Sequence, residues 1–89
     1  MQLPEEVVQE VRTRLRRAAG QVQAVDRMLG EGRDCRDVLT QLAAARRALE
    51  QAGFRLLSAG MLYCLADPDR AAAEGYPVEE MERLFLKLT

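Results

Sequence analysis

The chain has 89 residues and a mass of 10.0 kDa, enough for one small domain spanning 1–89. It contains two cysteines and no histidine, so it is not a disulfide-rich secreted scaffold and lacks the commonest general base. The net charge of −1 argues by itself against nucleic acid as a partner. Since no paired carboxylates, phosphate-binding loop or metal motif is visible either, we expect no enzyme.

The expected compartment is the cytoplasm. The first residues do not combine a basic start with an apolar run, so they do not predict a signal peptide. No segment approaches the ~18 apolar residues of a membrane helix, so we expect no membrane partner. In the cytoplasm both thiols would be kept reduced.

The first predicted helix begins after Pro4 and is ended by Gly30-Glu31-Gly32. Proline suits the first turn of a helix, and the acids that follow it complement the positive end of the dipole. Apolar or small residues then recur at alternating spacings of three and four, which is typical of a helix packed along one seam. These seam residues are Val8, Val11, Leu15, Ala18, Val22, Val25 and Leu29.

The second predicted helix runs from about Cys35 to Leu65, with Asp34 as its N-cap. Gly53 and Gly60 lie inside it, where glycine costs up to ~1 kcal/mol against alanine, so we expect close helix packing or a kink there. Its seam continues the same spacing through Cys35, Val38, Leu42, Ala45, Leu49, Ala52, Leu56, Ala59 and Tyr63.

The rest of the chain is more broken. Asp67-Pro68-Asp69 ends the second helix, and a short helical turn is expected over 69–74. Residues 78–88 carry apolar side chains at helical spacing and predict a third, amphipathic helix. No strand signal is present, so the predicted fold class is all-α.

Cys35 and Cys64 are candidate sensor residues. They are separated by ~43 Å of helix rise and lie nearly on one face, so they cannot meet within one continuous helix. In an antiparallel pair of such helices, with a two-fold axis near Leu49–Glu50, Cys35 of one copy would lie beside Cys64 of the other. The helix dipole and the adjacent arginines favour the nucleophilic thiolate form of Cys35, whereas the adjacent aspartates oppose it. This balance fits a pair in which Cys35 is the attacking cysteine and Cys64 the resolving one. The alternative is that both are small apolar core residues.

The near-neutral total conceals a basic middle segment. Residues 12–55 carry a net charge of +5, whereas the two ends are acidic. In a symmetric oligomer the arginines of each copy would together form a positive surface that could bind DNA phosphates. The alternative is that these arginines form a solvated helix face. The candidate DNA-binding residues are Arg14, Arg16, Arg17, Arg46 and Arg47.

Three motifs together resemble the copper-sensitive operon repressor (CsoR) family. They are Arg14-Leu15-Arg16-Arg17 with Gly20-Gln21-Val22, then Val25-Asp26-Arg27-Met28-Leu29, and then Cys35-Arg36-Asp37-Val38-Leu39-Thr40-Gln41-Leu42 followed by the second cysteine. The resemblance covers residues 12–65. It implies a three-helix protomer, an antiparallel four-helix-bundle dimer and a dimer-of-dimers tetramer.

The resemblance also implies a repressor that leaves its operator DNA when an inducer reacts at an inter-subunit site. The basic cluster at 12–17 and Arg46 match positions linked to DNA contact in the family. Relatives often carry another base slightly beyond Arg46, where this chain has Glu50 and Gln51.

One departure from the family pattern concerns the inducer. Copper-sensing members pair the two cysteines with a histidine four residues before the second one, and here that position is Gly60. Nickel and cobalt members use several histidines, and formaldehyde-sensing relatives lack the second cysteine. A bare thiol pair is similar to the persulfide-sensing CstR-like branch, which implies a reactive sulfur inducer, inter-subunit di- to tetrasulfides and no cofactor.

Two other functions stay open from the sequence. Cys35 and Cys64 could bind Cu(I) linearly, because thiolates are soft ligands that suit this ion. In a different class, the chain could be a helical assembly module with structural cysteines and no DNA role.

Overall fold

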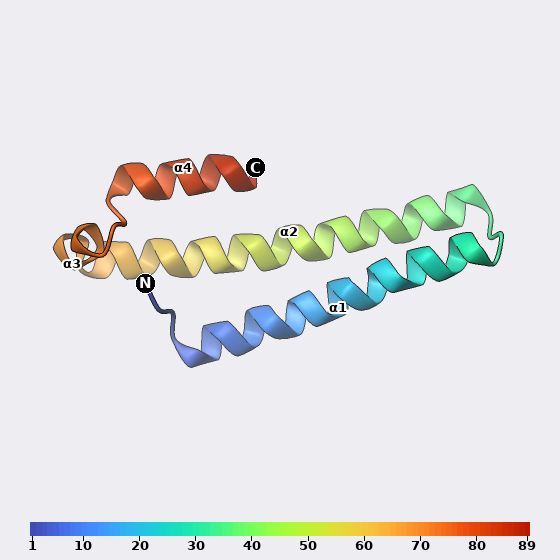
Figure 1. Cartoon of the computed structure of the whole chain (residues 1–89), viewed down its shortest axis with the longest axis horizontal. Helices are drawn as coiled ribbons and strands as arrows, with labels where there is room; N and C mark the ends of the chain where they lie inside the picture. Colours follow the sequence, from blue (N-terminus) through green and yellow to red (C-terminus); the bar gives the residue numbers. More distant parts are fainter.

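The computed structural model describes residues 1–89 and contains four α-helices and no strand. Two long helices, α1 and α2, form an antiparallel hairpin, and the last helix, α4, folds back along α2 on the opposite side from α1 in the view of Figure 1. The all-α prediction is confirmed. The helices span Glu5–Gly30 (α1), Cys35–Ala66 (α2), Pro68–Ala73 (α3) and Val78–Leu88 (α4).

The prediction of three helices is corrected to four, because the expected turn after α2 is a separate helix, α3. Proline at position 68 cannot continue α2, but its fixed φ suits the first turn of a new helix. The Asp67 side chain accepts a hydrogen bond from the Arg70 backbone amide, 3.1 Å away, and caps this helix. The predicted Asp34 cap of α2 is confirmed by its 3.1 Å bond from the Arg36 amide.

The hairpin core is a stripe of alanines and valines. Ala18 of α1 and Ala45 and Ala52 of α2 are at most 1% exposed. Small side chains allow two helix backbones to approach closely, and the spacing of seven keeps each contact on the same line. Near the start of α1 it is Val7 rather than the predicted Val8 that is buried. The small-residue stripe comprises Val11, Ala18 and Val25 of α1 and Val38, Ala45, Ala52 and Ala59 of α2.

The larger seam residues, which alternate with the members of the small-residue stripe, are exposed. They lie four residues after the members of the small-residue stripe, so they are turned by about 40° from the buried line. Because the helices are antiparallel, this offset turns both sets towards the same side of the hairpin. We call this surface the leucine stripe: Leu15, Val22 and Leu29 of α1 with Leu42, Leu49 and Leu56 of α2, which are 45–64% exposed.

The two glycines inside α2 are contact points for α4. A Cβ on Gly53 would lie 2.9 Å from Leu88 Cδ1, and a Cβ on Gly60 would lie 3.3 Å from Met81 Cε. The absence of side chains at both positions therefore lets α4 pack directly onto the surface of α2. Of the two expectations for these glycines, close packing is the one observed, and α2 continues through both positions.

Candidate functional site

The two cysteines lie near opposite ends of α2, which is continuous from Cys35 to Ala66. Cys35 is the first residue of the helix and is exposed, whereas Cys64 is buried two residues before its end. With a rise of 1.5 Å per residue, the two thiols cannot meet within one chain. Their pairing across a dimer stays a prediction.

Cys64 is enclosed by its own chain. It is 7% exposed and packs in one cluster with Ala71 of α3 and Met81 of α4. The N-terminal Met1 packs against the same cluster, as do Leu57, Tyr63, Tyr76 and Leu84. Cys35 and Cys64 therefore occupy contrasting surroundings: one thiol faces solvent, and the other lies in an apolar pocket.

Residue 60 lies one helical turn before Cys64 and therefore on the same face of α2. With glycine at this position, the space that a side chain would fill is bordered by Met81 and by Met1, whose Sδ lies 3.9 Å from the ideal Cβ position. No group of three or more His, Cys, Asp and Glu side chains is arranged to hold a metal ion.

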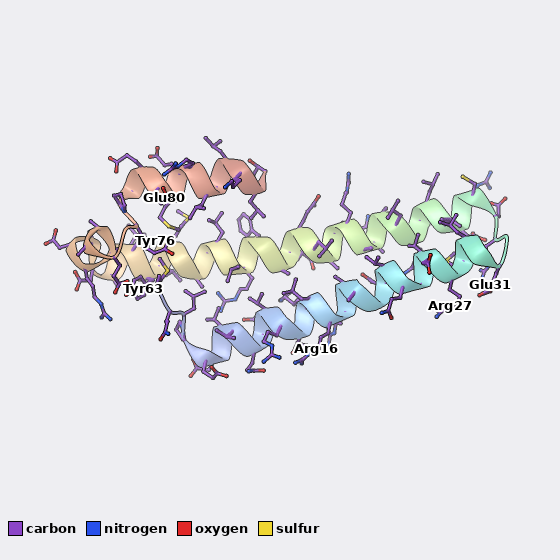
Figure 2. All side chains as sticks on the ribbon, in the orientation of Figure 1. Arg16, Arg27, Glu31, Tyr63, Tyr76 and Glu80 are labelled. Carbon is purple, nitrogen blue, oxygen red and sulfur yellow. The ribbon has the colours of Figure 1, made fainter.

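A polar network that the sequence did not reveal lies beside Cys64. The Tyr63 hydroxyl donates to the Glu74 carboxylate at 2.8 Å, and Arg70 Nε donates to the same carboxylate at 3.3 Å. The Arg70 guanidinium carbon lies 5.7 Å from the centre of the Tyr63 ring. This network ties α3 to the end of α2, where Tyr63 is seen in Figure 2. The hydrogen bond to Glu74 raises the pKa of Tyr63, and the same bond lowers the pKa of Glu74.

The predicted DNA-binding arginines of α1 differ in their surroundings. Arg16 and Arg17 are exposed and form no ion pair within the chain. Arg16 lies on the side of α1 that faces away from α2 (Figure 2). Arg14 is half-buried between the helices and contacts Glu10 at 3.5 Å. Glu10 also accepts from Arg55 of α2 at 2.8 Å, so Arg14 belongs to an interhelical ion-pair network.

The two arginines of α2 differ as well. Arg46 Nε lies 3.6 Å from Glu50 Oε1, so the acid beyond Arg46 offsets part of its charge. Arg47 is exposed and forms no ion pair. The freely exposed positive charge among the five candidates is therefore carried by Arg16, Arg17 and Arg47.

Comparison with known proteins finds a family match over most of the chain. Residues 8–87 match the family model described as metal-sensitive transcriptional repressor. The copper-sensing transcriptional repressor RicR of Mycobacterium tuberculosis is 44% identical over 64 residues, which are 72% of this chain and 64% of RicR. The chain thus spans slightly less than two thirds of that relative. The copper-sensing repressor CsoR of Bacillus subtilis is 29% identical over 90% of this chain and 79% of its own length.

Two solved structures share the fold. The nickel-responsive transcriptional regulator InrS superposes with a TM-score of 0.75 at 33% identity, covering 91% of each chain. The copper-sensing repressor CsoR of Geobacillus thermodenitrificans, solved with Cu(I), gives a TM-score of 0.70 at 32% identity over 99% of this chain and 84% of that one. None of the four helices combines the length and the hydropathy that a membrane-spanning segment requires.

Proposed function

Because the chain belongs to the metal-sensitive transcriptional repressor family, we propose that it binds operator DNA and releases it when reactive sulfur species modify its two thiols. Family members are transcriptional repressors rather than enzymes. The observation that carries the choice of inducer is the composition of the site. The chain offers two thiols, no imidazole, and a glycine at the position one turn before Cys64.

The proposed sensing reaction begins at Cys35, because it is the exposed thiol. Its thiolate attacks the sulfane sulfur of a low-molecular-weight persulfide, the S–S bond of the donor breaks, and the donor leaves as a thiolate. The thiolate of Cys64 in the partner subunit then attacks the Cys35 sulfur, forming a disulfide and releasing hydrosulfide. When one or two further sulfur transfers to Cys35 precede this attack, the Cys64 thiolate attacks the sulfur next to the terminal one, hydrosulfide leaves, and the product is a trisulfide or a tetrasulfide. The two thiols are oxidised, and the sulfane sulfur is reduced.

The exposed leucine stripe supports the antiparallel dimer that this reaction requires. A direct disulfide needs Cα atoms within roughly 7 Å, and each inserted sulfur relaxes that limit. Since Cys64 is covered by α3 and α4, bridge formation has to move these helices, and this movement would couple the thiol reaction to the arrangement of the bundle.

The test of the sulfur reaction uses purified protein, its own upstream DNA and a polysulfide donor under anaerobic conditions. We expect DNA release together with crosslinked dimers that carry zero, one or two extra sulfur atoms by mass spectrometry. Cys64→Ala should still gain sulfur on Cys35 but form no crosslink, whereas Cys35→Ala should do neither. Unchanged release from Cys35→Ala would contradict the proposed switch.

A second candidate inducer is Cu(I), and it is favoured by the copper-sensing relatives. In this version Cys35 and the partner's Cys64 bind the ion as two thiolates. Stoichiometric Cu(I) that releases DNA, with no sulfur adducts after polysulfide treatment, would select this function over the first. The helical assembly module without a DNA role is disfavoured by the family match.

A further inference from the structure

The short helix α3 covers the thiol of Cys64 at the end of α2. We propose that α3 is a lid over this thiol and that a polar latch holds the lid closed. The latch consists of Tyr63, Glu74 and Arg70. While the lid is closed, a sulfur donor reaches Cys35 but not Cys64, so the latch sets the order in which the two thiols react. This role rests on the proposed function and adds to it the control of the second thiol.

The covering contact is made by Ala71. It is fully buried and is the only buried residue of α3, which lies across the end of α2 (Figure 1). Ala71 packs in one cluster with Cys64, so movement of α3 uncovers the thiol. A thiol cannot attack a sulfur donor that has no access to it, and Cys64 therefore reacts only after the lid has opened.

The lid lies between two breaks in the helical backbone. On the side of α2 the break is Asp67, with φ of −150° and ψ of 84°. On the side of α4 it is Gly75, with a positive φ of 93° that glycine adopts without strain. Because neither residue is helical, α3 can turn as a unit while α2 and α4 keep their own hydrogen bonds.

The latch provides the side-chain hydrogen bonds between the lid and α2. The Tyr63 hydroxyl lies 2.8 Å from both oxygens of Glu74, and Arg70 Nε donates to the same carboxylate at 3.3 Å. No other side-chain hydrogen bond joins residues 68–75 to α2. Since a hydrogen bond to a charged group can shift an equilibrium by about tenfold, loss of the Tyr63 hydroxyl should raise the open population by about this factor.

The experiment uses the full-length Cys35→Ala variant, in which Cys64 is the only thiol. Alkylation by iodoacetamide under native conditions is followed by mass spectrometry, and its rate measures the population of the open lid. Tyr63→Phe removes only the hydroxyl and should react about tenfold faster than its parent. Glu74→Ala removes the acceptor of both Tyr63 and Arg70 and should act in the same direction.

The matched control is Tyr76→Phe in the same background. Tyr76 also packs against the Cys64 cluster, but its hydroxyl forms no hydrogen bond, so this variant should react at the rate of the parent. Urea concentrations below the unfolding transition separate lid opening from global unfolding. Local opening exposes little surface, so the alkylation rate should rise only slightly with urea.

Two outcomes would overturn the lid. One is an equal alkylation rate for Tyr63→Phe and Tyr76→Phe, and the other is a urea dependence as steep as that of global unfolding. Failure of the polysulfide response in the wild-type chain would overturn only the proposed function, since the alkylation uses neither polysulfide nor Cys35.

Discussion

At the residue scale, Gly60 and Gly53 differ in how closely the side chains of α4 approach them. An alanine there would place its Cβ 3.3 Å from the flexible end of Met81, which can move by a few tenths of an ångström. At Gly53 the added Cβ would lie 2.9 Å from Leu88 Cδ1, so the end of the Leu88 side chain would have to shift. The two glycines therefore tolerate a methyl group differently.

We predict that Gly60→Ala stabilises the protein by about 0.5–1 kcal/mol, because alanine is the better helix former. Gly53→Ala should gain less or lose stability, since the Leu88 side chain has to shift to make room for the added methyl group. Urea unfolding followed by circular dichroism measures both changes. Greater stability of Gly53→Ala than of Gly60→Ala would contradict the packing described for α4.

A second residue-scale prediction concerns Glu10. Its hydrogen bond to Arg55 is the main cause that lowers its pKa below the usual 4.5. A lowered pKa in the folded state means that stabilisation is present above the unfolded-state value and is lost as the pH falls through the lowered value.

Glu10→Gln should therefore be less stable than the wild type near neutral pH, and the difference should vanish on the acid side. Thermal unfolding between pH 7 and pH 3 checks this. Glu82→Gln is the control, because Glu82 forms no ion pair in the chain. A difference between Glu10→Gln and the wild type that persisted in acid would contradict the role of the ion pair.

At the scale of the elements, α1 and α2 present different amounts of free positive charge. Arg16 and Arg17 of α1 have no acidic partner, whereas Arg46 of α2 is paired with Glu50. Each phosphate contact that is lost lowers the salt dependence of DNA binding, with a slope of about −0.9 per neutralised phosphate on duplex DNA.

We predict that Arg16→Ala weakens DNA binding and reduces the salt slope by about one phosphate contact. Arg46→Ala should have a smaller effect, and Glu50→Gln should strengthen binding because it frees Arg46. Fluorescence anisotropy with the upstream DNA at several salt concentrations measures all three. Equal losses for Arg16→Ala and Arg46→Ala would contradict the partial neutralisation of Arg46.

At the scale of the whole molecule, the single chain is elongated and incompletely packed. Its radius of gyration is 16.9 Å, whereas a compact chain of this length has about 12 Å. Only 12 of 89 residues are buried, and all the members of the leucine stripe are at least 45% exposed. An apolar surface of this kind predicts a protein–protein contact.

Leu49→Glu should therefore disrupt self-association, because Leu49 lies on the leucine stripe near the proposed two-fold axis. A charge buried at this contact would lack a partner. Sedimentation analysis should show a smaller species or loss of helical structure. Thr40→Glu, exposed on α2 but outside the leucine stripe, should assemble like the wild type. Unchanged assembly of Leu49→Glu would contradict this interface.

The sequence by itself determined the helices and their ends, because these depend on local chemistry. Pro4 and Asp34 mark helix starts through fixed φ and capping, and Gly30-Glu31-Gly32 ends α1, with Gly32 at a positive φ of 69°; all three predictions are confirmed. It also indicated the family through the arginine motif and the cysteine spacing.

Only the tertiary structure decided which members of each seam are buried. The spacing alone does not say whether the alanines or the leucines face the neighbouring helix of the same chain. The tertiary structure also decided that Arg14 joins Glu10 and Arg55 in an ion-pair network, and that Gly60 lies beneath Met81. The contacts of Glu10 with Arg55 and of Gly60 with Met81 join residues that are far apart along the chain. Their partners are set by how α1 and α4 pack against α2, and no local pattern in the sequence encodes that packing.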